Sequence, residues 1–239
     1  MGKSLRQQKR GKGSIRFRAP SFRYRGVAKH PSLNSGNEIR TGVITDFIHC
    51  PGHSAPLAQV SYAGGEKCLT IAPAGMKVGD IVYAGGAAEP NTGNTLALEN
   101  IPEGTLIFNI ESKPGDGGKF ARTSGAAAKI LTKSPEKVVV LLPSKKQREF
   151  NLQCRASIGI VAGQGRTEKP FLKAGNHHYH MKQRNHYYPH VNGLSMNAVD
   201  HPYGGSRSSK KGKVTIAPRN APPGRKVGLI RPRRSGRRR

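Results

Sequence analysis

The distribution of charge constrains this chain more than any other feature of its sequence. Residues 1–40 contain 11 Lys or Arg and one acidic residue, and residues 171–239 contain 16 Lys or Arg and one acidic residue. Residues 41–170 contain 14 Lys or Arg and 11 acidic residues, so they carry only +3 of the total formal charge of +28. Segments with so much charge of one sign repel themselves and do not form a packed core alone. The sequence therefore predicts a nearly neutral folded body between two cationic extensions.

Such extensions favour a large polyanion as the partner. Each phosphate that a Lys or Arg side chain neutralises releases counterions, which drives binding. A membrane surface would instead call for an amphipathic basic helix or a lipidation motif, and neither extension has one. The longest aliphatic run, Val138–Leu142, is far too short to span a bilayer. We therefore expect a nucleic-acid partner and no membrane.

The cysteines indicate a reducing compartment. Cys50, Cys68 and Cys154 are odd in number, widely spaced and without a C-x-x-C pair. This pattern argues against a disulfide framework and against a cysteine zinc site. The first residues also lack the apolar core of a secretory signal. We expect reduced cysteines in a cytoplasmic protein.

The body alternates short β-type segments with Gly, Pro and Asn turns. We expect strands at residues 42–48, 57–62, 67–72, 77–83 and 104–110, and then at 137–142, 148–153 and 157–161. Residues 126–131 fit either a strand or a helical turn. The first five strands predict an oligonucleotide-binding-like barrel over residues 41–112, and the rest a small SH3-like barrel over 113–170. The predicted fold class is all-β, with long irregular basic extensions at 1–40 and 171–239.

The first extension interleaves aromatic and guanidinium side chains. Phe17, Phe22 and Tyr24 lie among four arginines, and such side chains stack on unpaired bases and grip phosphates. The alternative is that these aromatic rings pack on the body. The second extension has no helical or strand period, and we expect a long irregular arm.

The segment 195–205 of that arm combines polar and aromatic side chains and ends in Gly204 and Gly205, which allow close backbone approach. Asp200 and His201 suggest an acid–base pair. Adjacent residues on an extended chain point in opposite directions, however, which disfavours a hydrogen-bonded dyad. We therefore do not favour an enzyme. An enzyme that uses these two residues on nucleic acid and a stand-alone RNA chaperone both remain as alternatives.

Five histidines between residues 177 and 190 raise the question of a zinc site. His186 and His190 have the i, i+4 spacing that suits a helix, but Pro189 opposes a helix there. No cysteine lies nearby, so we expect no resident metal and no other cofactor. Binding of a metal by the histidine-rich segment 177–190, and magnesium carried by RNA, stay open. The imidazoles are then interpreted as contacts to phosphate, ribose and base edges.

The segment 195–205, SMNAVDHPYGG, resembles the AMNPVDHPHGG segment of the family of the universal second protein of the large ribosomal subunit. Further segments resemble the same family in order along the whole chain: 54–58, 65–67, 72–80, 100–105, 109–115, 121–125, 154–159 and 221–230. The last of these resembles the archaeal tail. Two positions depart from the family pattern, Ala198 where Pro is frequent and Tyr203 where His is frequent.

The resemblance implies the two barrels and two extensions buried in ribosomal RNA. It also implies roles in subunit assembly, in association with the small subunit and in shaping the peptidyl-transferase region, where the RNA performs the chemistry. Asp200 and His201 are then expected close to that region, and the partners are large-subunit RNA, neighbouring ribosomal proteins and the small subunit. The departure at Tyr203 argues against any role that needs a second imidazole there.

The residues that we expect to contact RNA are cations of both extensions and polar or small residues of the second. They are Arg6, Lys9, Arg10, Arg16, Arg18, Arg23, Arg25, His177, His178, Lys182, Arg184, Asn197, His201, Gly204, Gly205, Arg207, Lys210, Lys211, Arg225, Lys226, Arg233 and Arg234. Phosphate contacts of the cations are expected to position the protein and supply most of the affinity.

Overall fold

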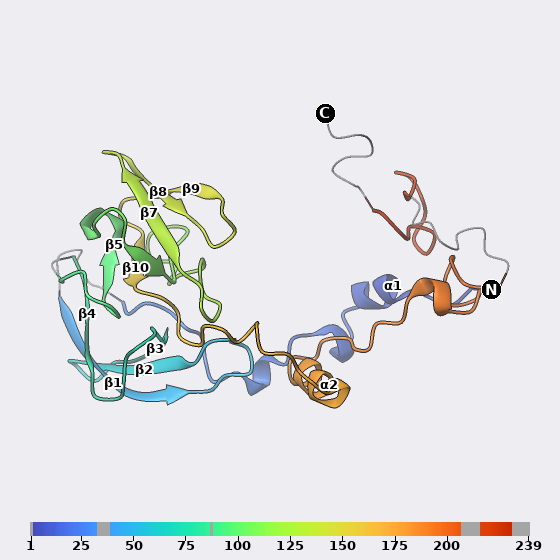
Figure 1. Ribbon diagram of the computed structural model, residues 1–239, viewed down its shortest axis with the longest axis horizontal. Helices are drawn as coiled ribbons and strands as arrows, with labels where there is room; N and C mark the ends of the chain where they lie inside the picture. The colour runs from blue at the N-terminus through green and yellow to red at the C-terminus, as the bar shows by residue number, and fades with distance from the viewer. Residues whose placement is uncertain (1, 33–38, 87, 207–215, 231–239) are drawn as a thin grey trace. The chain divides into compact units, whose positions relative to one another are not determined.

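The computed structural model of the chain describes residues 2–32, 39–86, 88–206 and 216–230 (Figure 1). These residues form two compact units. One unit comprises residues 21–171, and the other combines the two ends of the chain, residues 1–20 and 172–239. We call them the β unit and the terminal unit.

The β unit contains one hydrogen-bonded sheet of ten strands in the order β3-β2-β1-β4-β5-β10-β6-β7-β8-β9. The strands are β1 Arg40–Ile48, β2 Leu57–Tyr62, β3 Lys67–Ile71, β4 Ile81–Ala84, β5 Thr95–Ala97, β6 Leu106–Phe108, β7 Ala128–Lys133, β8 Lys137–Leu141, β9 Gln147–Asn151 and β10 Arg155–Ile158. All pairings are antiparallel except that of β4 with β5, a single parallel contact between Ala84 and Thr95. The sheet is therefore least connected at that point.

Alternating side chains of these strands fill separate apolar cores. In β8, Val138 and Val140 are fully buried while their neighbours are not, as expected for a strand with one face on a core. Strands β5 and β6 contribute Leu96 and Ile107 to this same core. Strands β1, β2 and β4 pack around a different core that contains Ile44.

These strands confirm the all-β prediction of an oligonucleotide-binding-like part followed by a small SH3-like part. Residues 126–131, left open between strand and helical turn, contribute to strand β7. Strand β5 was not predicted, and the expected strand at 77–83 begins only at Ile81 because residues 77–80 form a turn. The division of the body between residues 112 and 113 stays a prediction.

A buried ion pair ties residues before β1 to the β unit. The carboxylate of Glu111 is fully buried and accepts hydrogen bonds from the Arg155 side chain, one of them 2.8 Å long. The same guanidinium donates to the backbone carbonyl of Pro31 at 2.6 Å. His30 is also buried, and its Nε2 lies 2.7 Å from the carbonyl oxygen of Asn109. The chain around His30 and Pro31 therefore packs on the body, where an extended arm was expected.

The terminal unit contains two short α-helices, α1 Arg6–Gly11 and α2 Ala174–Gln183. In α1, the side chain of Gln8 accepts a hydrogen bond from the backbone N–H of Leu5 at 2.7 Å, which satisfies a free donor at the helix start. Basic residues lie in the last turn of both helices, where they interact favourably with the negative end of the helix dipole. Neither helix was predicted. The structure thus corrects the expectation that these segments lack regular elements.

The 3-10 turns among the described residues are η1 Ile15–Phe17, η2 Ser21–Arg23, η3 Leu98–Asn100 and η4 Gly193–Ser195.

A small apolar cluster holds distant segments of the terminal unit together. Leu5, Tyr203 and Val227 are exposed by only 8%, 8% and 6%, and Leu194 packs against them. Among the described residues, no helix is both long and apolar enough to cross a membrane. The two ends of the chain therefore share a core, although each alone is poor in apolar residues.

Candidate nucleic-acid interface

The expected RNA contacts lie in both units. On the terminal unit, α1 carries Arg6, Lys9 and Arg10, η1 carries Arg16, α2 carries His177, His178 and Lys182, and the remaining described positions are Arg18, Arg184, Asn197, His201, Gly204, Gly205, Arg225 and Lys226. On the β unit, Arg23 and Arg25 precede the strands. Arg207, Lys210, Lys211, Arg233 and Arg234 lie outside the described residues. Most of the described cations are exposed; Arg6, Arg184 and Lys226 are half-buried.

The loop after η4, residues 196–205, is closed by its own backbone hydrogen bonds. The N–H of Asp200 and that of His201 both donate to the carbonyl of Asn197, at 2.9 and 3.1 Å. The N–H of Gly204 donates to the carbonyl of His201 at 2.9 Å, and that of Gly205 reaches the carbonyl of Met196 at 3.2 Å. The segment is thus an ordered, compact loop.

Gly204 is needed inside this loop. A Cβ added there would lie 2.6 Å from the carbonyl oxygen of Met196, and the carbonyl of Asn197 is also in contact. Both obstacles are backbone atoms, which cannot rotate away as a side chain can. The backbone at Gly204 therefore approaches the loop itself closely, and the contact of Gly204 and Gly205 with RNA stays a prediction.

Asp200 and His201 have separate partners. The Asp200 carboxylate forms an ion pair with the Lys3 ammonium at 3.2 Å. The backbone N–H of Lys3 donates a hydrogen bond to the carbonyl of Val199 at 2.9 Å. The Nδ1 of His201 accepts the backbone N–H of Tyr203 at 3.0 Å, which assigns the ring proton of the neutral form to Nε2. Burial and the nearby Arg6 charge lower the pKa of His201, so the imidazole is neutral at pH 7.

A cluster of rings and guanidinium groups lies beside this loop in the terminal unit. The rings of Phe17 and Tyr187 are nearly parallel, at 17°, with centroids 6.4 Å apart. The guanidinium carbons of Arg6 and Arg16 lie 4.7 and 5.5 Å from the Tyr187 centroid, and that of Arg10 lies 6.0 Å from the Phe17 centroid. Two aromatic faces of similar orientation thus lie close to three positively charged guanidinium groups.

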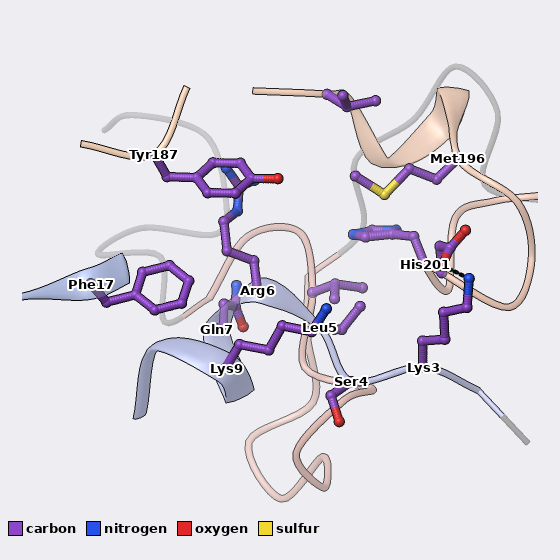
Figure 2. A pocket seen from close by; sticks show the side chains of 13 residues that line it. Lys3, Ser4, Leu5, Arg6, Gln7, Lys9, Phe17, Tyr187, Met196 and His201 are labelled. Carbon is purple, nitrogen blue, oxygen red and sulfur yellow. Dashed lines mark ion pairs between the residues drawn. The ribbon is translucent and has the colours of Figure 1, made fainter. Parts of the chain in front are cut away.

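The cluster borders a pocket of about 360 Å³. Figure 2 shows Phe17 and Tyr187 on one side of it and Met196 and His201 on the other, with Arg6 extending toward Tyr187. The pocket is also lined by the apolar side chains of Leu5, Val191 and Val227. Its charged lining residues include Lys3, Lys9 and Asp200. The pocket combines an apolar interior with a cationic rim.

The histidine-rich run is divided by the end of α2. His177, His178 and His180 lie on the helix, which ends before His186. The His177 ring lies 4.5 Å from that of Tyr188, centroid to centroid. Within the described ranges, no three His, Cys, Asp or Glu side chains are grouped so that they could hold a metal ion.

The aromatic residues of the first extension divide between the two units. Phe17 joins the cluster of the terminal unit. Tyr24 packs on the β unit, where a Cβ on Gly52 would touch its ring, as the alternative to base stacking anticipated. Phe22 is 81% exposed beside Arg23, so this pair retains the expected stacking surface.

Sequence reasoning missed the residues that bring the two ends of the chain together. Leu5 is a lone apolar residue among cations, and only its burial against Tyr203 and Val227 shows its role. The pairing of Lys3 with Asp200 joins residues 197 positions apart and has no local signal. The one hint was Asp200 itself, the single acid among the residues 171–239.

Comparison with known proteins covers nearly the whole chain. The family model for the RNA-binding N-terminal domain of Ribosomal Proteins L2 matches residues 3–84, and that for their C-terminal domain matches residues 91–225. The chain is 50% identical to the large ribosomal subunit protein uL2 of Haloarcula marismortui, over 99% of this chain and 98% of the relative. It is 47% identical to uL2 of Methanopyrus kandleri, over 99% of this chain and 98% of the relative. It is 48% identical to uL2 of Methanococcoides burtonii over the full length of both proteins. These relatives are archaeal.

Proposed function

Because the chain belongs to the ribosomal protein L2 family, we propose that it is a structural constituent of the large ribosomal subunit that binds ribosomal RNA. The observation that carries the proposal is the match over the full chain together with the concentration of exposed cations on the terminal unit. The family consists of structural components, and the chain is not an enzyme. Large-subunit RNA and neighbouring ribosomal proteins are its partners, in ribosomes of the cytoplasm.

The cations of the terminal unit act as anchors. Lys9, Arg10, Arg16 and Arg18 are exposed near one end of the chain, and Lys182 and Arg225 near the other. Each phosphate that such a side chain neutralises releases counterions and adds to the affinity without reading sequence. Because Leu5 and Val227 share a core, RNA meets both groups of cations on one folded unit.

The closed loop 196–205 supplies shape. Its backbone hydrogen bonds hold the neutral His201 ring and the paired Asp200 carboxylate in fixed places. We place this loop close to the peptidyl-transferase region, where it supports the RNA that performs the chemistry. Association with the small subunit belongs to the same proposal, as does magnesium carried by the RNA.

Reconstitution tests the proposed function. Large subunits are assembled from ribosomal RNA and total protein with this chain omitted, and then with the purified full chain restored. We expect omission to reduce the yield of sedimenting subunits and their association with small subunits, and restoration to recover both. Equal yield and association without the chain would contradict the proposal.

Photocrosslinking tests the position of the loop. A photoreactive phenylalanine analogue replaces Val199, which is 49% exposed in the loop, or Lys146, which is exposed between β8 and β9. We expect the Val199 position to crosslink to RNA of the peptidyl-transferase region and the Lys146 position to crosslink elsewhere. Crosslinks from Val199 only to distant RNA would refute the placement.

A further inference from the structure

We propose that the pocket of the terminal unit binds a single unpaired nucleotide extruded from folded RNA. The base would stack on the Phe17 and Tyr187 rings, and its phosphates would lie against the cations of the rim. This inference rests on the proposed function, because it names the RNA feature that one part of the protein recognises.

The size and walls of the pocket fit a nucleotide. Its volume of about 360 Å³ lies in the range of roughly 300–1,000 Å³ typical of small-ligand sites. Two nearly parallel rings line it, and every base has a flat π face that stacks on such rings. Leu5, Met196 and Val227 complete an apolar interior that would cover the edge of a base.

The charge of the pocket favours a nucleotide over an apolar segment of a protein. Lys3, Arg6 and Lys9 line the pocket, and the one acidic residue that lines it, Asp200, is already paired with Lys3. A phosphate at the rim would be attracted, whereas an uncharged side chain would gain nothing from these cations.

The surrounding arginines fit the same ligand. Arg16 is exposed and lies 5.5 Å from the Tyr187 centroid, so its guanidinium can move from the ring to a phosphate when a base takes its place. The more buried Arg6 has a side-chain contact with His190 and lies beside the Tyr187 ring, so it keeps positive charge next to the stacking surface. Unpaired bases in RNA are recognised by such combinations of rings and guanidinium planes.

The test compares two RNA hairpins of equal length, one with a single bulged 2-aminopurine nucleotide and one fully paired. The full-length chain is titrated with each at about 0.2 M salt, where non-specific phosphate binding is weakened. We expect the bulged hairpin to bind roughly 5- to 150-fold more tightly, the gain that stacking of one base on aromatic side chains provides. The 2-aminopurine emission should be quenched on binding.

Substitutions assign the preference to the pocket. Tyr187→Leu keeps an apolar side chain but removes the π face, so the preference for the bulge should vanish while binding of the paired hairpin is unchanged. Tyr187→Phe should retain the preference. The matched control is Tyr179→Leu, which removes a 69% exposed tyrosine of α2 that does not line the pocket. Unaltered circular dichroism shows that each variant is folded.

Several results would overturn the inference. They are equal binding of the two hairpins by the wild-type chain, an equal loss for both with Tyr187→Leu, and the same loss with Tyr179→Leu. Tyr187-dependent binding of an uncharged phenylalanine tripeptide amide, without a bulge preference, would assign the pocket to a protein partner. Binding of large-subunit RNA is measured in parallel. If that RNA is still preferred while the bulge is not, the pocket proposal fails and the proposed function stands.

Discussion

Replacing Gly204 by alanine should open the loop 196–205 and weaken RNA binding strongly. The added Cβ would meet the backbone carbonyls of Met196 and Asn197, so the loop must move apart. Opening breaks the hydrogen bonds that Gly204 and Gly205 donate, at 2.9 and 3.2 Å, and exposes Tyr203 from the apolar cluster.

The magnitude follows from these contacts. Two backbone hydrogen bonds contribute about 1 kcal/mol each, and partial exposure of one aromatic side chain costs about 1–2 kcal/mol. RNA that requires the closed loop must restore it, so the apparent affinity falls by the same free energy. A total of about 3–4 kcal/mol corresponds to a loss of roughly 150- to 900-fold.

The assay is the affinity of the full-length chain for large-subunit RNA at fixed salt. Gly175→Ala in α2 is the matched control, since nothing lies within 4 Å of its added Cβ and alanine stabilises a helix by up to about 1 kcal/mol. It should bind like the wild type. Arg225→Ala, which removes one exposed cation, should weaken binding less than Gly204→Ala does.

An affinity of Gly204→Ala within a factor of two of the wild type would refute this reasoning. So would an equal loss for Gly175→Ala, because the effect would then not depend on the contacts of the loop.

Three further predictions concern single side chains. His30 is buried, and burial lowers its pKa to about 4 despite the nearby Glu111 charge. Because the unfolded chain binds this proton more tightly, the free energy of unfolding should fall by about 3 kcal/mol as the pH is lowered from 6.5 to 4, and it should stay level above pH 6.5. Urea titrations at several pH values measure this dependence, and His30→Gln should flatten it. Leu5→Ala should destabilise the packing of α1 by about 1–3 kcal/mol and speed amide hydrogen exchange in residues 5–11 without affecting strand β8, and unchanged exchange there would argue against the cluster. His201→Ala should lower the translation rate of purified variant ribosomes or the yield of subunits while RNA binding persists; normal values of both would contradict a role for this ring.

The strands of the body could be predicted from sequence because their signals are local. Strand β2 lies at the expected residues 57–62, and β8 differs from the expected 137–142 by one residue. Strand β5 has only three residues, so alternation of side chains cannot reveal it. Helix α2 contains Gly175, Asn176 and several histidines, which have low helix propensity, and it buries no residue, so no apolar period marks it.

The candidate site was predicted in composition but not in arrangement. The cationic residues and the loop 196–205 stood out by charge and by resemblance. The fold of the loop on itself depends on backbone contacts of Gly204, and the joining of the chain ends depends on Leu5 and Lys3 meeting residues nearly 200 positions away. Contacts at such separation leave no periodic pattern in a single sequence.

The central claim is that cations of the terminal unit anchor the protein on ribosomal RNA. The most direct measurement is the salt dependence of binding of the full-length chain to large-subunit RNA and to an unrelated RNA of equal length. About eight phosphate contacts predict a log–log slope of roughly −6 to −7. Two variants replace six exposed cations by glutamine, either Lys9, Arg10, Arg16, Arg18, Lys182 and Arg225 of the terminal unit or Lys67, Lys77, Lys113, Lys129, Lys145 and Lys146 of the β unit.

We expect the wild-type chain to prefer large-subunit RNA over the unrelated RNA. The terminal-unit variant should lose most of the affinity, and its log–log slope should become smaller in magnitude by about 4 to 5. The β-unit variant should lose much less of both. Equal slopes for the two variants, or equal binding of both RNAs at every salt concentration, would contradict the claim.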